Sequence, residues 1–269
     1  MAAAVLISAR MQKKARMIAC ALASLLTQAC SITSPSPSDL RPPGDAVRRI
    51  VAERVTAVVV TERDNLDGWV NRKFAVSQAP RDADGGSAAP ITPDGYFLTA
   101  DHVLSRLGER HVFLICSQGG RLAPAEARVV WRSKSADVAL LHAPLRTPFF
   151  YRWTAPDRWL PAGNRVIHGG ISTGSKSAAG KLATAIPPEG HFTRHRRFKI
   201  DIPLQPGDSG GPVVDASGRL VGINSAVEFL VPLETPFFID SEGNRPNTRQ
   251  LAAVIAKDRR RHDPMQTKS

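Results

Sequence analysis

The sequence predicts an all-β fold, a barrel or a sandwich, that ends in a single helix. From about residue 50 onward the apolar segments are short and rich in Val, Ile and Leu, and turns with Gly, Pro and Asp separate them. Many short strands at such spacing are typical of barrels and sandwiches. Residues 247–260 alone have apolar positions at helical spacing, and the basic end of this segment suits the dipole of a helix.

Eight segments have the clearest strand patterns. They cover residues 54–61, 96–99, 112–116, 127–131, 138–142, 165–168, 199–202 and 220–223. Residues typical of hairpin turns stand between them at 93–95 and at 215–218. Within the predicted helix, we expect Leu251, Val254 and Ile255 to face the core.

The composition is that of a folded chain. Its 269 residues are 42% apolar and 22% charged, which excludes a disordered tail and a small peptide scaffold. The three cysteines, Cys20, Cys30 and Cys116, are too few for a disulfide framework. Cys116 lies in an apolar strand segment without a basic residue closely before it, so we expect a buried thiol rather than a nucleophile.

The N-terminal segment has the layout of an export signal. Residues 11–30 contain a basic stretch, an apolar run at 17–26 and then small or uncharged residues before Cys30. The run is too short to span a bilayer, which needs about 20 residues. Residues 26–30 resemble a bacterial lipobox, so we expect residues 1–30 to be a lipoprotein signal and Cys30 to be lipidated. The expected product is an outer-membrane lipoprotein that faces the periplasm; the alternative is an ordinary signal cut near Ala29 and a periplasmic or secreted protein.

The remaining chain is predicted to be a spacer followed by one domain. Residues 31–45 are rich in Ser and Pro and are expected to form a semi-rigid linker, and residues 46–262 are expected to fold as one domain. The whole chain has 36 Lys and Arg against 24 Asp and Glu, a net charge of +12. Removal of residues 1–30 removes four basic residues and no acid, so 32 basic residues remain against 24 acids, a net charge of +8.

The basic run 191–199 is the best argument for nucleic-acid binding, because it interleaves aromatic and cationic side chains. For an exported chain without a nucleic-acid module, we favour a solvated loop or an edge strand. A weaker alternative is that these charges steer acidic substrates or touch anionic lipids. Nucleic acid is therefore not an expected partner. No cofactor or metal is expected either, since no CxxC pair or acidic cluster is present and the His residues are scattered.

The motif 207–212, GDSGGP, is the first of three segments that suggest chemistry. A nucleophilic serine needs backbone N–H groups aimed at the developing oxyanion, and neighbouring glycines allow the tight turn that presents them. Ser209 is therefore the candidate nucleophile, and the amides of Gly207 and Ser209 are the candidate oxyanion donors. A turn without chemical meaning is the alternative, but it is rare for this motif.

The other two segments supply a base and an acid. His102 follows the predicted strand at 96–99 and can take the proton of a serine hydroxyl. Asp137 opens an apolar strand, where a buried carboxylate is costly unless it is hydrogen-bonded; accepting the Nδ1 proton of His102 would meet that cost. Asp101 is a competing carboxylate, but adjacent residues of an extended segment point to opposite faces, so Asp137 is preferred. Taken alone, His102 or Asp137 would more often be structural.

Together the three segments resemble the trypsin-like serine peptidases, whose triad runs His, Asp, Ser along the chain. Over roughly residues 50–230, the chain is most similar to bacterial HtrA-type protease domains, in GGS at 85–87, TADHV at 99–103, SADVALL at 135–141 and the stretch around GDSGGP. The resemblance implies two six-stranded antiparallel β-barrels, about 46–145 and 146–245, with a C-terminal helix at about 247–260. The active site would lie between the barrels.

The resemblance also implies roles for residues near the nucleophile. Ser225 stands where such enzymes carry a Ser or Thr that supports the aspartate and lines the substrate cleft. Val227 replaces a usual Gly in the substrate-binding segment, and Pro203 stands at the base of the specificity pocket. Without an acid there, we expect a small or medium apolar residue before the scissile bond. Because only nine residues follow the helix, we do not expect the PDZ domain that HtrA-type members usually carry.

The predicted function is that of a serine endopeptidase that cleaves proteins of the bacterial cell envelope through an acyl-enzyme, with protein or peptide substrates and a lipid anchor to the membrane. The alternative is a trypsin-like fold with an idle triad that serves as a binding or assembly module. The oligomeric state stays open.

Overall fold

A computed structural model describes residues 41–66, 82–118, 121–173, 178–230 and 237–262. The chain divides into two compact units, Met1–Ser34 and Pro35–Ser269, and every described residue belongs to the second. The predicted signal, Cys30 and most of the predicted linker therefore lie outside the described residues.

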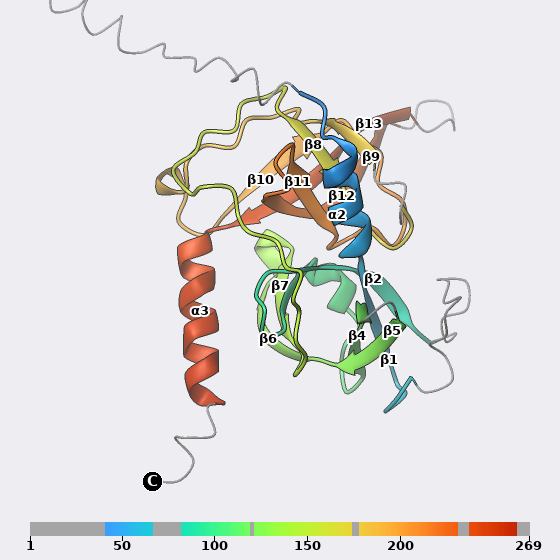
Figure 1. The fold of residues 1–269 in the computed structure, drawn as a ribbon. Coiled ribbons are helices and arrows are strands. Elements are labelled where there is room, and N and C mark those ends of the chain that lie inside the picture. Colours follow the sequence, from blue (N-terminus) through green and yellow to red (C-terminus); the bar gives the residue numbers. More distant parts are fainter. Residues whose placement is uncertain (1–40, 67–81, 119–120, 174–177, 231–236, 263–269) are drawn as a thin grey trace, which may run out of the picture. The chain divides into compact units, whose positions relative to one another are not determined.

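The first half of the described chain forms a curled antiparallel sheet of seven strands, in the order β5-β4-β1-β2-β3-β7-β6 (Figure 1). Its strands are β1 (Thr56–Thr61), β2 (Asp84–Pro90), β3 (Tyr96–Thr99), β4 (His111–Gln118), β5 (Arg121–Glu126), β6 (Arg128–Ser133) and β7 (Val138–His142). The expectation of six strands was one short. The hairpin turn predicted before Tyr96 is present, with Gly95 at φ 87°.

The second half forms a curled antiparallel sheet of six strands, in the order β10-β13-β12-β11-β8-β9. Its strands are β8 (Arg165–His168), β9 (Ala178–Lys181), β10 (His195–Ile200), β11 (Pro212–Asp215), β12 (Leu220–Leu230) and β13 (Phe237–Pro246). Residues 195–199 of the basic run lie on the edge strand β10, and residues 191–194 lie before it. This agrees with the loop or edge strand favoured from the sequence, and Phe198 is buried in the core rather than exposed for stacking. The predicted all-β fold is confirmed.

Both sheets contribute to one shared apolar core. Leu98 and Leu140 of the first sheet and Ile167 and Ile223 of the second belong to the same cluster of buried side chains, and all four are fully buried. Each sheet also has a core of its own. The shared cluster holds the two sheets against each other, and residues at their junction are consequently held in a defined geometry.

A short helix, α2 (Asp45–Glu53), precedes β1 and was not predicted. The expectation that only one segment of the chain is helical is wrong. Val47 and Val51 are four positions apart, so they lie on one face of this helix, and both are buried in the shared core. Glycine is needed at 169 because a Cβ there would lie 2.3 Å from a methyl group of Val51.

The C-terminal helix, α3 (Thr248–Arg261), confirms the prediction for 247–260. Asn247 caps it by accepting hydrogen bonds from two backbone amides, and Leu251 and Ile255 are buried in the shared core.

The two ends of α3 are bonded to different halves of the domain, and Figure 1 shows that the helix starts where β13 ends. At its start, the backbone N–H and the hydroxyl of Thr248 donate to Glu189, which lies in the 3₁₀ turn η4 (Glu189–His191) of the second half. Near its end, Asp258 accepts hydrogen bonds from Tyr96 of β3 and Arg128 of β6. Neither α2 nor α3, the α-helices of the described part of the chain, has the length and apolar character that a bilayer crossing requires.

Candidate active site

The nucleophile loop lies directly before β11, at the junction of the two sheets. The backbone N–H of Ser87, on β2 of the first sheet, donates to the carbonyl of Ser209 at 2.8 Å. Gly210 has φ 85°, in the region that favours glycine, and a Cβ there would lie 2.2 Å from the carbonyl oxygen of Ser87. The glycines of the motif therefore allow the loop to approach the opposite sheet closely.

The peptide groups of this loop are held in fixed orientations. The Pro206 carbonyl accepts a hydrogen bond from the Ser172 hydroxyl, and the Gly207 carbonyl accepts one from the Ser87 hydroxyl at 2.6 Å. In a trans peptide the C=O and N–H groups point in opposite directions, so the amide of Gly207 points away from Ser172. The carbonyl before Ser209 accepts from the backbone N–H of Gly211 at 2.9 Å, which orients the Ser209 amide in the same way.

Asp208 anchors the loop from behind. Its carboxylate is fully buried and accepts four hydrogen bonds, from the backbone amides of Ser172, Thr173 and Gln205 and from the Thr173 hydroxyl, at 2.5–3.2 Å. A buried carboxylate is stable only when it is paired or hydrogen-bonded, and here the segment after β8 supplies most of the donors. Gly170 leaves room for this group, because a Cβ there would lie 2.2 Å from Oδ1.

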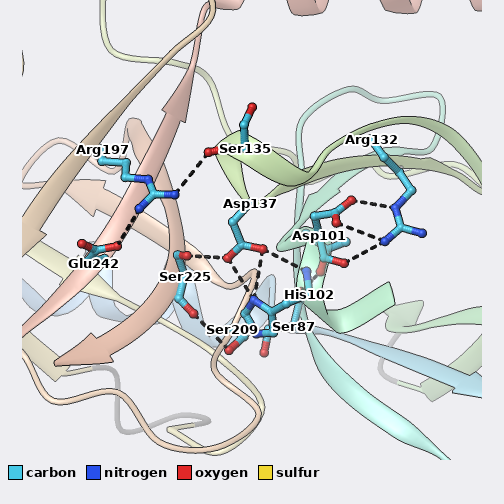
Figure 2. A network of polar contacts seen from close by, with 11 residues as sticks. Ser87, Asp101, His102, Arg132, Ser135, Asp137, Arg197, Ser209, Ser225 and Glu242 are labelled. Carbon is cyan, nitrogen blue, oxygen red and sulfur yellow. Dashed lines mark hydrogen bonds and ion pairs between the residues drawn. The ribbon is translucent and has the colours of Figure 1, made fainter. Parts of the chain in front are cut away.

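His102 lies on a 3₁₀ turn, η2 (Asp101–Leu104), that follows β3 (Figure 2). Its Nδ1 lies 2.9 Å from Oδ2 and 3.1 Å from Oδ1 of Asp137, and its backbone N–H donates to Oδ1 at 2.9 Å. The hydrogen bond to Asp137 raises the pKa of the imidazole, although burial partly opposes this effect. The side chain is 49% exposed, so a substrate can reach it.

Asp137 stands between the 3₁₀ turn η3 (Lys134–Ala136) and β7, with a left-handed φ of 49° that aspartate tolerates. Besides the bonds to His102, its Oδ2 accepts a hydrogen bond from the Ser225 hydroxyl on β12 (Figure 2). Burial alone would raise its pKa, but the hydrogen bonds from His102 and Ser225 outweigh burial and lower the pKa to about 2. Asp137 is therefore an anion that holds Nδ1 of His102 protonated.

The Ser209 hydroxyl donates to the Ser225 carbonyl at 3.4 Å, and among the described residues it makes no hydrogen bond to His102. Figure 2 shows Ser209 beside His102 and Ser225. The structure thus brings the predicted base, acid, nucleophile and Ser225 together, with the hydroxyl turned toward the Ser225 carbonyl.

The remaining predicted positions have different outcomes. Val227 lies on β12 and pairs with Ser241, but its side chain is outside the described part. Pro203 is exposed, and Cys116 is buried on β4, as expected. His191 and His195 have the four-residue spacing of some metal ligands, but one ends a 3₁₀ turn and the other begins a strand. Among the described residues, no three His, Cys, Asp or Glu side chains are grouped as a metal site requires.

Several residues around the site were not predicted from sequence. Ser87 and Ser172 hold carbonyls of the nucleophile loop, and Arg132 binds the carboxylate of Asp101. Asp101 lies on a 3₁₀ turn rather than on the extended segment assumed above, so the argument from opposite faces does not apply. Its carboxylate accepts hydrogen bonds from Arg132 instead. The GGS segment at 85–87 was a signal for Ser87, whereas nothing in the sequence marks Ser172 or Arg132.

Comparison with known proteins matches residues 86–223 to the family described as trypsin-like peptidase domain. The chain is 28% identical over 200 residues to a "probable periplasmic serine endoprotease DegP-like" of Rhizobium meliloti, covering 73% of this chain and 37% of that protein. It is also 28% identical over 192 residues to a protein of the same description from Pseudomonas fluorescens, covering 63% and 38% of the two chains. The chain thus spans little more than a third of the length of these relatives.

Among solved structures, the fold is similar to that of an HtrA-type protease, AlgW, in complex with a decapeptide. The TM-score is 0.55 at 19% identity, and the match covers 78% of this chain and 66% of that one. At this identity the likeness supports the fold alone.

Proposed function

Since this chain belongs to the trypsin-like peptidase family, we propose that it is a serine endopeptidase that hydrolyses peptide bonds in proteins of the bacterial cell envelope. The observation that carries the proposal is the set of contacts around one carboxylate. Asp137 binds both the imidazole Nδ1 of His102 and the hydroxyl of Ser225, on the strand that also contacts Ser209.

In the proposed reaction, Nε2 of His102 takes the proton of the Ser209 hydroxyl as its oxygen attacks the substrate carbonyl carbon. The amides of Gly207 and Ser209 stabilise the tetrahedral oxyanion. His102 then gives the proton to the leaving amine, the C–N bond breaks and an acyl-enzyme forms. A water molecule, deprotonated by His102, hydrolyses this ester and restores Ser209. Asp137 stays ionised and keeps the imidazole oriented.

The hydroxyl of Ser209 must leave the Ser225 carbonyl before the first step, which requires a rotation about one side-chain bond. Catalytic hydrogen bonds are often long or misaligned before substrate binds. The same observation favours a second candidate, a catalytically idle trypsin-like fold that serves as a binding or assembly module. In that case the contact between Ser209 and Ser225 would persist.

Labelling with a fluorophosphonate probe distinguishes the two candidates, because the probe reacts only with an activated serine. We expect the parent protein to be labelled and Ser209→Ala to be inert. Loss of Ser209 or His102 should lower peptide turnover by about 10⁶-fold, as in other triads. A folded parent protein that takes no label would contradict the peptidase proposal and favour the binding module.

The proposed cleavage preference is for a small or medium apolar residue before the scissile bond. The segment 202–206, which precedes the nucleophile loop, contains no acid that could bind a Lys or Arg side chain. A peptide library digested by the protein should therefore show cuts after such apolar residues. Predominant cutting after Lys or Arg would contradict this preference.

We also propose an envelope location, with the lipidated Cys30 as an anchor in the outer membrane. The basic and apolar pattern of residues 11–30 and the periplasmic description of the relatives support export. Metabolic labelling with palmitate should mark the parent protein and not Cys30→Ala. Equal labelling of both would contradict lipidation at this cysteine.

A further inference from the structure

A second carboxylate lies beside the proposed base. Asp101 immediately precedes His102 on the 3₁₀ turn, and its side chain is only 7% exposed. Two carboxylates therefore act on one imidazole, since Asp101 adds to the effect of Asp137 in raising the pKa of His102. A general base works best when its pKa lies near the working pH, so an uncompensated second anion would hold His102 protonated.

One guanidinium binds Asp101 at three points (Figure 2). Arg132, on β6, donates from Nε to Oδ1 at 2.6 Å, from Nη2 to Oδ2 at 3.1 Å, and from Nη2 to the main-chain carbonyl of Asp101 at 3.2 Å. The planar fork of arginine matches a carboxylate in a way that the ammonium of lysine cannot. Because the Arg132 side chain is 27% exposed, solvent screens this pair less than it would a surface pair.

The same contacts hold the peptide group that joins Asp101 to His102. Arg132 binds its carbonyl, while its N–H, which belongs to His102, donates to Asp137 at 2.9 Å. The peptide is thus fixed from both sides, and the position of the imidazole depends on both contacts.

The charged groups around the imidazole are few in the described part of the chain. Asp137 contacts it directly, and Asp101 lies beside it. Arg132 binds Asp101 and not the ring itself. Arg197, which is paired with Glu242 at 3.7 Å, donates to the carbonyl of Ser135, two residues before Asp137 (Figure 2).

We propose that Arg132 is a positioning residue for the base, which clamps the Asp101–His102 peptide and partly offsets the charge of the neighbouring carboxylate. This inference rests on the proposed function, in which His102 is the general base. In this inference Asp101 is the residue that Arg132 binds, and it is not a hydrogen-bond partner of the imidazole.

The test compares Arg132→Gln, Arg132→Lys and Asp101→Asn with the parent protein. The pH midpoint of the His102 ring is measured by NMR in the Ser209→Ala background, and kcat/KM for a peptide is measured with Ser209 intact. We expect Arg132→Gln to raise the midpoint and Asp101→Asn to lower it, because each changes the charge near the ring. Arg132→Lys keeps the charge, so its midpoint should stay near that of the parent, while kcat/KM falls about 10-fold or more through loss of the clamp.

Arg132→Gln leaves a buried carboxylate unpaired, so the double variant with Asp101→Asn serves as the folded counterpart. We expect its midpoint to lie below that of Arg132→Gln and above that of Asp101→Asn, because it lacks both the carboxylate and the guanidinium. Arg106→Gln is the matched control: this arginine lies just after the same turn, pairs with Asp84 and is 73% exposed, so its loss should leave the midpoint unchanged.

Unchanged midpoints in folded Asp101→Asn and Arg132→Gln would overturn the inference, because a merely structural arginine would not alter the titration of the ring. If Arg132→Gln does not fold, equal midpoints in folded Asp101→Asn and the double variant would overturn it for the same reason. The midpoints do not require peptidase activity. A parent protein that takes no fluorophosphonate label but shows the expected midpoints would therefore contradict the proposed function and leave the role of Arg132 supported.

Discussion

Replacement of Arg245 by methionine should destabilise this domain more than the loss of any surface charge. The Arg245 and Glu189 side chains are 3% and 4% exposed and lie 2.7 Å apart. The guanidinium also donates to the hydroxyl of Thr154 at 2.5 Å and to the carbonyl of Val221 at 3.2 Å. Burial lowers the pKa of Arg245 and outweighs the opposing attraction of Glu189.

The expected magnitude follows from what Arg245→Met leaves behind. Glu189 would remain buried as an unpaired anion, and loss of one partner of a buried ion pair costs about 3–5 kcal/mol. In a domain of this size each kcal/mol lowers Tm by about 2–4 °C, so the expected decrease is about 6–20 °C. Since Glu189 also binds the first turn of α3, part of the decrease should appear as loss of this helix.

Calorimetry and urea unfolding of the purified protein measure this effect, with Arg259→Met as the matched control. Arg259 pairs with Asp94, but the two side chains are 49% and 46% exposed, so its loss should cost about 1 kcal/mol or less. Addition of Glu189→Gln to Arg245→Met should recover part of the stability, because it removes the stranded charge. Equal decreases in Tm for the two arginine variants would refute the reasoning from burial.

Three further predictions concern the site and its surroundings. Ser225→Ala should raise the pKa of Asp137 and destabilise the protein at neutral pH by about 1.5–3 kcal/mol, as expected for a hydrogen bond to a charged group; urea unfolding checks this, and an unchanged midpoint would contradict it. Acidification should destabilise the fold, because the pKa values of Asp137 and Asp258 are lowered from 3.8 to about 2. The stability that they provide is complete above about pH 5 and is lost as the pH falls toward 2, and thermal unfolding across this range should show the decline. Gly210→Ala should abolish fluorophosphonate labelling, because φ is 85° and the Cβ would lie 2.2 Å from a carbonyl oxygen. Gly190→Ala, with no atom within 4 Å of the new Cβ, should be labelled like the parent.

The strands that could be predicted from sequence are those with continuous apolar runs. Residues 138–142 and 165–168 were predicted with the bounds of β7 and β8, because both runs are largely buried and bordered by turns. β2, DGGSAAP, lacks such a run, since Gly86 is required where a Cβ would lie 2.6 Å from the side chain of Val103. β13 carries Asp, Ser, Glu and Asn, whose place in a sheet depends on pairing with both β10 and β12.

In the site, too, local motifs could be predicted and long-range contacts could not. The types and order of His102, Asp137 and Ser209 are local signals, so they could be proposed from motifs. Arg132 and Asp101 are 31 positions apart and meet only after β6 pairs with β7, and no local pattern marks such a contact. α2 escaped prediction for a similar reason, since two valines four apart become informative only when the core that receives them is known.

The helix α3 also has a consequence for how the chain tolerates insertions. It is 14 residues long, which corresponds to about 21 Å. It is bonded to the turn η4 of the second half at its first turn and to the first sheet near its last. One added residue would lengthen it by about 1.5 Å and rotate everything beyond by about 100°, so Asp258 would turn away from Tyr96. Surface loops usually accept insertions. This helix sets the spacing between its contacts with the two halves of the domain, so its number of residues matters as much as their identity.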